Sequence, residues 1–339
     1  MSCHFRLCSL KPAGSALAVA LSCATLCPGI TSAQTQAPAG LVEPVYRVAD
    51  ASAAAAAAPV AQPEQPAAQP VQPAATESQP AQVAARIVEP AAAQAPFNLD
   101  PIPGQHPLVP ALRVAQESLK HLDATIQDYQ AVLIKRERID GELMDKEVAF
   151  VKVRHQPFSV YMFFISPNKG QECLYVAGPN GEEGRLHALG SGLKRKFGVF
   201  EFGPHDRMVM KGQKYPITKL GIRNLTSELV DVATNDVNFG ECEVQVSQNV
   251  LGTTDGPKRP VTVLEVTHPT PRRNFRFYKA QVFIDNELRV PIRYAAYMWP
   301  ENPGEAPPLE EEYTYLNVKI NNGFNDATFS KDNPEIFKD

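Results

Sequence analysis

Apolar residues recur every three to four positions in one segment and every two positions through most of the chain that follows it. Between residues 108 and 127 the spacing is helical, and Pro107 and Pro110 suit a first turn, which predicts an amphipathic helix. After Asp128 the period becomes two, which predicts strands near 129–139, 144–155, 158–166, 171–178 and 185–189. Turn residues such as Asp140-Gly141 separate these strands.

A helical segment interrupts the strands in the middle of the chain. Leu225, Leu229 and Val232 share one side of the second half of residues 216–234, which predicts a helix there. Strands are then expected at 241–250, 260–267, 273–284, 289–298 and 310–321. Two runs of strands around a helical insertion, with a helix in front, predict the α+β class.

One predicted strand is apolar on both of its faces. The segment Ser159–Ile165 reads SVYMFFI, without the alternation expected of a strand that has one face in water. One face can pack on the helix, and the other then needs a second apolar environment. That environment is either another layer of core or a cavity.

The first 98 residues differ in composition from the rest. Residues 1–33 are predicted to be a signal peptide, because Arg6 and Lys11 precede an apolar stretch too short to span a bilayer and small residues follow it. Lipidation at Cys23 is an alternative. Residues 34–98, rich in Ala, Pro and Gln, are predicted to be a disordered linker, either an inert tail or a spacer. Both segments predict an exported protein of the periplasm or cell envelope, with one folded domain at 99–339.

The charge balance argues against nucleic acid as a partner. Of 33 Lys and Arg residues four precede residue 96, and of 37 Asp and Glu residues five do. The remainder carries 29 positive against 32 negative groups, a net charge of −3. A phosphate backbone is held by an excess of basic groups, which this chain lacks.

The cysteine count agrees with export. Four of the six cysteines lie in the predicted signal peptide, so that only Cys173 and Cys242 remain after cleavage. In an oxidising compartment these two can form one disulfide, or they can stay unpaired as small buried apolar groups.

Candidate catalytic chemistry is sparse. The seven histidines show no metal-ligand spacing, and no nucleophile elbow occurs, so the sequence predicts no enzyme, no metal site and no cofactor. The run Glu310–Glu312 is either a cation site or a solvated strand edge. The basic cluster Lys194–Lys196 and the pair Arg272 and Arg273 are either solvated turns or contacts for anionic lipid headgroups or a partner.

Several motifs near the C-terminus resemble those of the outer-membrane lipoprotein-carrier superfamily, the LolA/LolB-like proteins. They are Val282-Phe283-Ile284-Asp285, Pro291-Ile292-Arg293 and Leu316–Asn321. A closer resemblance covers residues 119–337. The segments LIKRERIDGEL, KVRHQPFSVYMFFISP, GQECLYVAGPNG, YPITKLGI and LEEEYTYLNVKIN look like family 1571 of secreted bacterial domains of unknown function. That family brings no assigned activity.

The carrier resemblance implies a strongly curved antiparallel sheet, an open half-barrel, with helices packed on its concave face around an apolar cavity. The cavity of such a fold takes a lipid or lipoprotein acyl chain. Eight aromatic residues are candidates to line it, and each can equally be ordinary core: Phe150, Tyr161, Phe163, Phe275, Phe277, Tyr294, Tyr313 and Tyr315. An envelope protein-interaction or sensory module on the same scaffold, without ligand, is the alternative.

Overall fold

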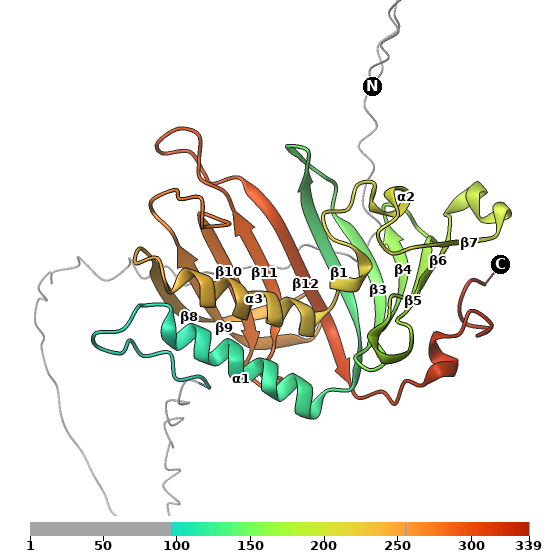
Figure 1. The fold of residues 1–339 in the computed structure, drawn as a ribbon, viewed down its shortest axis with the longest axis horizontal. Coiled ribbons are helices and arrows are strands. Elements are labelled where there is room, and N and C mark those ends of the chain that lie inside the picture. The colour runs from blue at the N-terminus through green and yellow to red at the C-terminus, as the bar shows by residue number, and fades with distance from the viewer. Residues whose placement is uncertain (1–95, 255, 339) are drawn as a thin grey trace, which may run out of the picture. The chain divides into compact units, whose positions relative to one another are not determined.

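An open antiparallel sheet carries most of the structure (Figure 1). The computed structural model describes residues 96–254 and 256–338, which belong to one compact unit of the chain, Val42–Asp339. The predicted signal peptide at 1–33 and the predicted linker up to residue 95 lie outside the described residues.

The sheet has twelve strands, eleven of them on one continuous path. Their order is β7-β6-β5-β4-β3-β1-β12-β11-β10-β9-β8, with β2 paired to β1. The bounds are β1 Asp128–Ile139, β2 Glu142–Leu143, β3 Glu147–Arg154, β4 Ser159–Ser166, β5 Glu172–Val176, β6 Arg185–Leu189, β7 Val199–Phe202, β8 Glu243–Gly252, β9 Lys258–Thr267, β10 Lys279–Asp285, β11 Pro291–Tyr297 and β12 Leu309–Ile320. Because β1 pairs with both β3 and β12, the two runs of strands predicted from the sequence join at the centre of one sheet.

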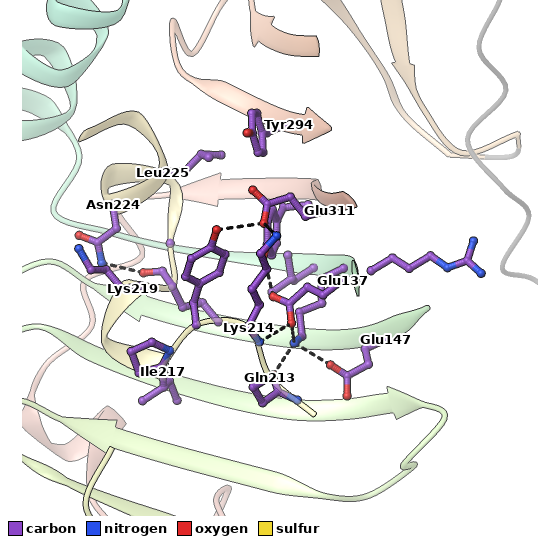
Figure 2. Close-up of a pocket in the computed structure, with 18 of the residues that line it drawn as sticks. Glu137, Glu147, Gln213, Lys214, Ile217, Lys219, Asn224, Leu225, Tyr294 and Glu311 are labelled. Atoms are coloured by element: carbon purple, nitrogen blue, oxygen red, sulfur yellow. Dashed lines mark hydrogen bonds and ion pairs between the residues drawn. The ribbon is translucent and has the colours of Figure 1, made fainter. Parts of the chain in front are cut away.

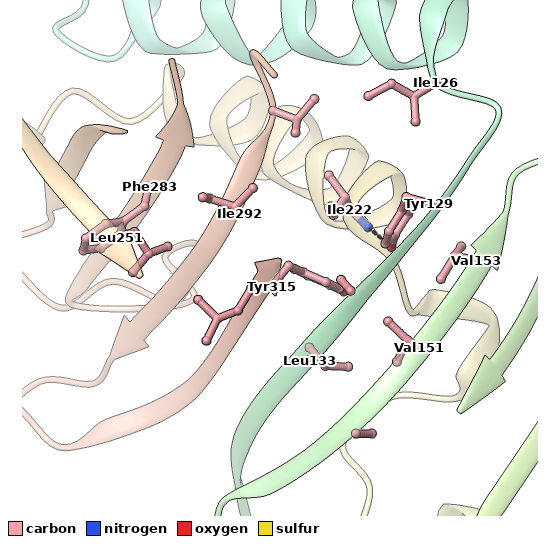
Figure 3. Packing of buried hydrophobic residues seen from close by; sticks show 14 of the residues in the cluster. Ile126, Tyr129, Leu133, Val151, Val153, Ile222, Leu251, Phe283, Ile292 and Tyr315 are labelled. Atoms are coloured by element: carbon pink, nitrogen blue, oxygen red, sulfur yellow. Dashed lines mark hydrogen bonds between the residues drawn. The ribbon is translucent and has the colours of Figure 1, made fainter. Parts of the chain in front are cut away.

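Two helices pack on the concave face, which confirms the predicted fold class. Helix α1 spans Val109–Thr125 and helix α3 spans Ile222–Asp236, and they lie side by side across the strands (Figure 1). Helix α3 starts after Gly221, whose φ of 114° suits a glycine. The Ile222 N–H there donates to the buried Tyr129 hydroxyl at 2.9 Å, which fixes the start of α3 against β1 (Figure 3).

Both faces of β4 are buried, as its composition requires. Met162 and Phe164 belong to the main core cluster and line the concave side. Tyr161 and Phe163 point the other way and pack in a separate cluster. That cluster is completed by the C-terminal segment 322–338, through Phe324, Phe329, Ile336 and Phe337. Both environments that the sequence allowed for β4 are therefore present: its concave face lines a cavity, and its outer face packs against a second layer of core.

Two local predictions differ from the structure, and two short elements were not predicted. The strand expected at 273–284 begins only at Lys279, because the Phe275 ring stacks on the buried His268 ring, with 3.8 Å between centroids, and holds this stretch as a loop. Strand β7 and the single-turn helix α2, Arg207–Met210, are too short for their periodicity to be read. The solvated-edge interpretation of Glu310–Glu312 is wrong, because β12 lies between β1 and β11 and Glu311 is buried.

One buried carboxylate fixes the C-terminal segment to the sheet. Asp128 accepts the backbone N–H groups of Asn322 at 2.6 Å, Gly323 at 3.1 Å and Phe324 at 3.0 Å. Three backbone donors are thus satisfied by one side chain, at the point where the chain leaves β12 and turns to the outer face. Two ion pairs continue the attachment, Arg154 with Asp326 and Lys152 with Glu335.

We expect Asp128→Asn to lower the free energy of unfolding by about 1.5–3 kcal/mol, because one carboxylate acceptor is replaced by an amide donor facing N–H groups. Urea unfolding followed by circular dichroism measures this. Asp332→Asn, in the exposed part of the same segment, serves as control and should change stability little. Equal stability of the two variants would show that Asp128 does not anchor the segment.

Candidate functional site

A cavity of about 1380 Å³ lies between the concave face of the sheet, the two helices and the segment 203–220. It exceeds the range of about 300–1,000 Å³ usual for small-molecule sites. The sheet contributes residues of β1, β3, β4, β5, β6, β7, β9, β10, β11 and β12 to the lining. The cavity is partly open to solvent.

Most of the lining is apolar. On the side of β9–β11 the wall contains Leu264, Val266, Val282 and Ile284, which face Leu225, Leu229 and Val232 of α3. Around β4–β7 it contains Met162, Phe164, Leu186, Leu189, Phe200 and Phe202. The segment 203–220 adds Met208, Val209, Met210, Ile217 and Leu220. An elongated apolar group placed here would be removed from water along most of its length.

A polar cluster interrupts this apolar lining at β1 and β12 (Figure 2). Its first centre is the buried Lys135, whose ammonium lies 3.2 Å from a Glu137 oxygen and 2.9 Å from a Glu147 oxygen. The same ammonium donates to the side-chain carbonyl of Gln213. Glu137 also accepts the Tyr313 hydroxyl at 2.6 Å, so both of its oxygens are occupied.

The second centre of the cluster is Lys214, in the segment that covers the sheet. Its ammonium lies 2.6 Å from a Glu310 oxygen and 2.9 Å from a Glu311 oxygen. Glu311 in turn accepts the Tyr215 hydroxyl at 3.0 Å. The Lys214 backbone N–H donates to Glu137 at 3.0 Å and joins the two centres. Since the polar atoms of the cluster are satisfied by one another, the apolar walls are the surface left for a ligand.

Burial changes the protonation behaviour of this cluster. Burial raises the pKa of the Glu311 carboxyl above its usual 4.5, against the opposing effect of the nearby Lys214 ammonium. Burial and the negative charges of Glu311 and Glu137 raise the pKa of Tyr313 far above its usual value, so this phenol remains a donor. Burial opposes the charge of Lys214, but its contacts with Glu310 and Glu311 raise its pKa overall, so it stays protonated.

The structure distributes the eight predicted cavity residues over different places. Phe277, Tyr294, Tyr313 and Tyr315 line the cavity. Tyr161 and Phe163 pack under the C-terminal segment instead, and Phe275 stacks on His268. Phe150, by strand alternation, shares the outer face of β3 with Lys152 and Arg154. Whether the four lining residues bind a ligand stays a prediction.

The two predicted headgroup contacts lie away from the cavity. Neither Arg272 nor Arg273 is among the lining residues. The Arg272 guanidinium forms two contacts with Glu241, at 2.6 and 2.9 Å, and Arg273 is exposed. Their contact with a headgroup or a partner stays a prediction.

The polar cluster was not predicted from the sequence, although a signal for it exists. Lys135 and Glu137 fall on the same face of β1 as the apolar Leu133, and Glu311 shares its face of β12 with Tyr313 and Tyr315. Charged residues that continue an apolar face of a central strand must be buried with partners. The partners Gln213 and Lys214 come from an irregular segment, and no periodicity places them.

The two cysteines of the folded domain are free. Burial raises the pKa of the Cys173 thiol to about 12, and burial together with nearby Asp236 and Glu243 raises that of Cys242 to about 12 as well. Both therefore remain protonated at neutral pH. This agrees with the expected alternative of unpaired small apolar groups.

A buried histidine–aspartate pair is the arrangement nearest to a catalytic one. His268 Nε2 lies 3.2 Å from an Asp236 carboxylate oxygen, and Nδ1 lies 3.2 Å from the Glu241 carbonyl oxygen. Both ring nitrogens are thus used to join the end of α3 to β9. Among the described residues, no group of three or more His, Cys, Asp or Glu side chains is placed to hold a metal ion. None of the described helices is long and apolar enough to cross a membrane.

The raised pKa of Glu311 predicts a pH dependence of stability. A carboxyl whose pKa is raised in the fold contributes stability below pH 4.5, and this contribution is lost as the pH rises through the folded pKa. Glu311→Gln cannot ionise, so its free energy of unfolding should improve relative to wild type from pH 4.5 to 7. The gain is about 1.4 kcal/mol for each unit by which the pKa is raised.

Urea unfolding at the two pH values measures this difference. Glu117→Gln, at an exposed position of α1, is the control and should show no such trend. A Glu311→Gln variant that instead loses stability relative to wild type as the pH rises would contradict the assignment.

Solved structures with a similar arrangement come from several bacteria. One is the putative outer membrane lipoprotein-sorting protein domain of Vibrio parahaemolyticus, with 14% identity, 65% of this chain and 96% of that chain covered, and a TM-score of 0.31. Another is a LolA superfamily protein of Nitrosomonas europaea, with 15% identity, 64% and 98% coverage, and a TM-score of 0.26. The lipoprotein LppX of Mycobacterium tuberculosis has 14% identity, 64% and 98% coverage, and a TM-score of 0.34.

These three structures are only distantly similar to this chain. All three TM-scores lie below 0.5, so no ligand or partner is carried over from them. No curated protein matches the chain. The model of one family, described as a protein of unknown function (DUF1571), matches residues 126–336, which is more than half of the chain. The chain therefore belongs to the DUF1571 family, as its sequence motifs predicted.

Proposed function

We propose that this protein is a non-enzymatic cell-envelope protein that binds an apolar ligand, the acyl chain of a lipid or lipoprotein, in the cavity under its curved sheet. The observation that carries the proposal is the cavity of about 1380 Å³, which is lined mostly by apolar side chains and whose polar cluster at β1 and β12 is paired internally. Each methylene buried there contributes about 0.8 kcal/mol. A long chain therefore gains enough free energy to bind without a polar anchor.

The proposed domain organisation fits this function. A signal peptide at 1–33 would export the chain, a linker at 34–98 would separate the domain from its point of attachment, and residues 99–339 would form the binding domain. Phe277, Tyr294, Tyr313 and Tyr315 are the predicted aromatic residues that remain candidates for ligand contact. A protein-interaction or sensory module is the second candidate, and large apolar side chains exposed at residues 193–215 favour it.

Filling part of the cavity should weaken the binding of a ligand. Ala115 of α1 lines the cavity, so Ala115→Trp should lower the affinity for a fluorescent fatty acid about tenfold, the equivalent of about two buried methylenes. Gln116→Trp places the same ring on the exposed side of the helix and should bind as wild type. Fluorescence titration of the full chain measures both.

Native mass spectrometry of the purified wild-type chain is the complementary measurement and should detect a copurified lipid. Wild-type protein that neither takes up the fatty acid nor carries a lipid would refute acyl binding. The interaction-module interpretation would then take its place.

A further inference from the structure

Exposed apolar side chains gather in one part of the fold. Of the nine large apolar side chains exposed in the described part of the chain, six fall between residues 193 and 215. The most exposed are Leu193 at 78%, Phe197 at 74% and Met208 at 73%. Leu193 and Phe197 belong to the short helical turn Gly192–Phe197 before β7, and Met208 belongs to α2, which Figure 1 shows above β4.

This apolar surface borders the cavity. Phe197, Phe200 and Met208 line the cavity and are exposed at the same time, so they lie at its opening. Leu193 lies beyond them and does not line the cavity. We call Leu193, Phe197, Phe200 and Met208 the mouth patch. An exposed cluster of this kind is uncommon on a monomeric protein and marks an interaction surface.

Basic residues stand between the apolar ones. Lys194, Lys196, Arg207 and Lys211 are exposed neighbours of the mouth patch in the chain. Within the described residues none of these four takes part in an ion pair. The two acidic residues of the same stretch are engaged, Glu201 with Arg185 at 2.9 Å and Asp206 with the Gly203 N–H at 2.7 Å. The surface therefore offers unpaired positive charge around apolar groups.

We propose that the mouth patch docks on an anionic lipid bilayer. Exposed Leu, Phe and Met side chains enter the interfacial region of a bilayer, while Lys and Arg beside them contact lipid phosphates. This combination of charge and apolar surface fits an anionic membrane better than a protein partner, whose interface core is depleted of charge. Docking in this position turns the cavity opening towards the membrane.

The inference concerns a surface and not the cavity, so it can fail separately from acyl binding. Leu193 and Lys196 do not line the cavity, and their variants should keep uptake of the fluorescent fatty acid in solution. If wild-type protein binds vesicles but does not take up the fatty acid, the proposed docking surface is supported and acyl binding in the cavity is refuted.

The test measures cosedimentation of the full chain with vesicles of phosphatidylglycerol and phosphatidylcholine, and with phosphatidylcholine alone. Wild type should bind the anionic vesicles more strongly, and less so as salt rises above about 0.15 M. Lys196→Glu should lower the partition coefficient several-fold, and Lys196→Glu combined with Leu193→Ser by about tenfold or more.

Matched controls lie elsewhere on the molecule. Arg273→Glu makes the same charge reversal at an exposed loop away from the cavity, and Val246→Ser removes an exposed apolar group from β8. Both should bind vesicles as wild type. A loss with Arg273→Glu but not with Lys196→Glu would place the membrane contact at the other loop and overturn the proposal.

Two further outcomes also overturn it. Wild-type protein that does not distinguish the two kinds of vesicle has no anionic docking surface. A concentration-dependent dimer that Leu193→Ser dissolves, together with unchanged vesicle binding, would assign the mouth patch to a second copy of the chain.

Discussion

The concave face of this sheet is wider than its two helices can cover. Eleven strands at about 4.8 Å spacing span about 48 Å, whereas α1, with 17 residues, is about 26 Å long. The helices lie across the strands from β8 towards β1 and leave the β3–β7 side without a helix of comparable length (Figure 1). An irregular segment, 203–220, covers that side, and short turns cannot fill the volume as a helix does. The cavity therefore results from the difference between the width of the sheet and the length of the helices.

The polar cluster is what allows an irregular segment to lie over an apolar face. Lys135 and Glu137 continue the inner face of β1, where unpaired charges would be costly. Gln213 and Lys214 supply their partners from the covering segment, and Glu311 supplies one from β12. A buried network of this kind contributes less to net stability than to the choice of one position for the chain. Together with the packing of Ile217 and Leu220 against the core, it fixes the segment over the apolar face.

The sequence predicts the strands and helices better than it predicts what each face of a strand packs against. Alternation identifies β1 and β3 because each has one continuous apolar face, whereas β4 is identified by its run of apolar residues. Alternation also places Tyr313 and Tyr315 on a common side of β12. It cannot say which face of β4 meets a cavity, because Phe163 and Phe164 are equally apolar. The answer depends on Ile336, which is far away in sequence and packs against the outer face. The strand predicted for residues 273–278 is wrong for a similar reason, because the stacking of Phe275 on His268 overrides the strand propensity of these residues.

The covering segment combines two tasks that are usually separate. It carries Met208, which lines the cavity opening, and Lys214, which holds the segment to the sheet through buried carboxylates. The segment is held by these polar contacts and by the packing of Ile217 and Leu220 against the core, whereas the sheet behind it is extensively paired. In this fold the paired sheet forms one wall of the cavity, and the contacts of Lys214 with Glu310 and Glu311 hold the covering segment against it.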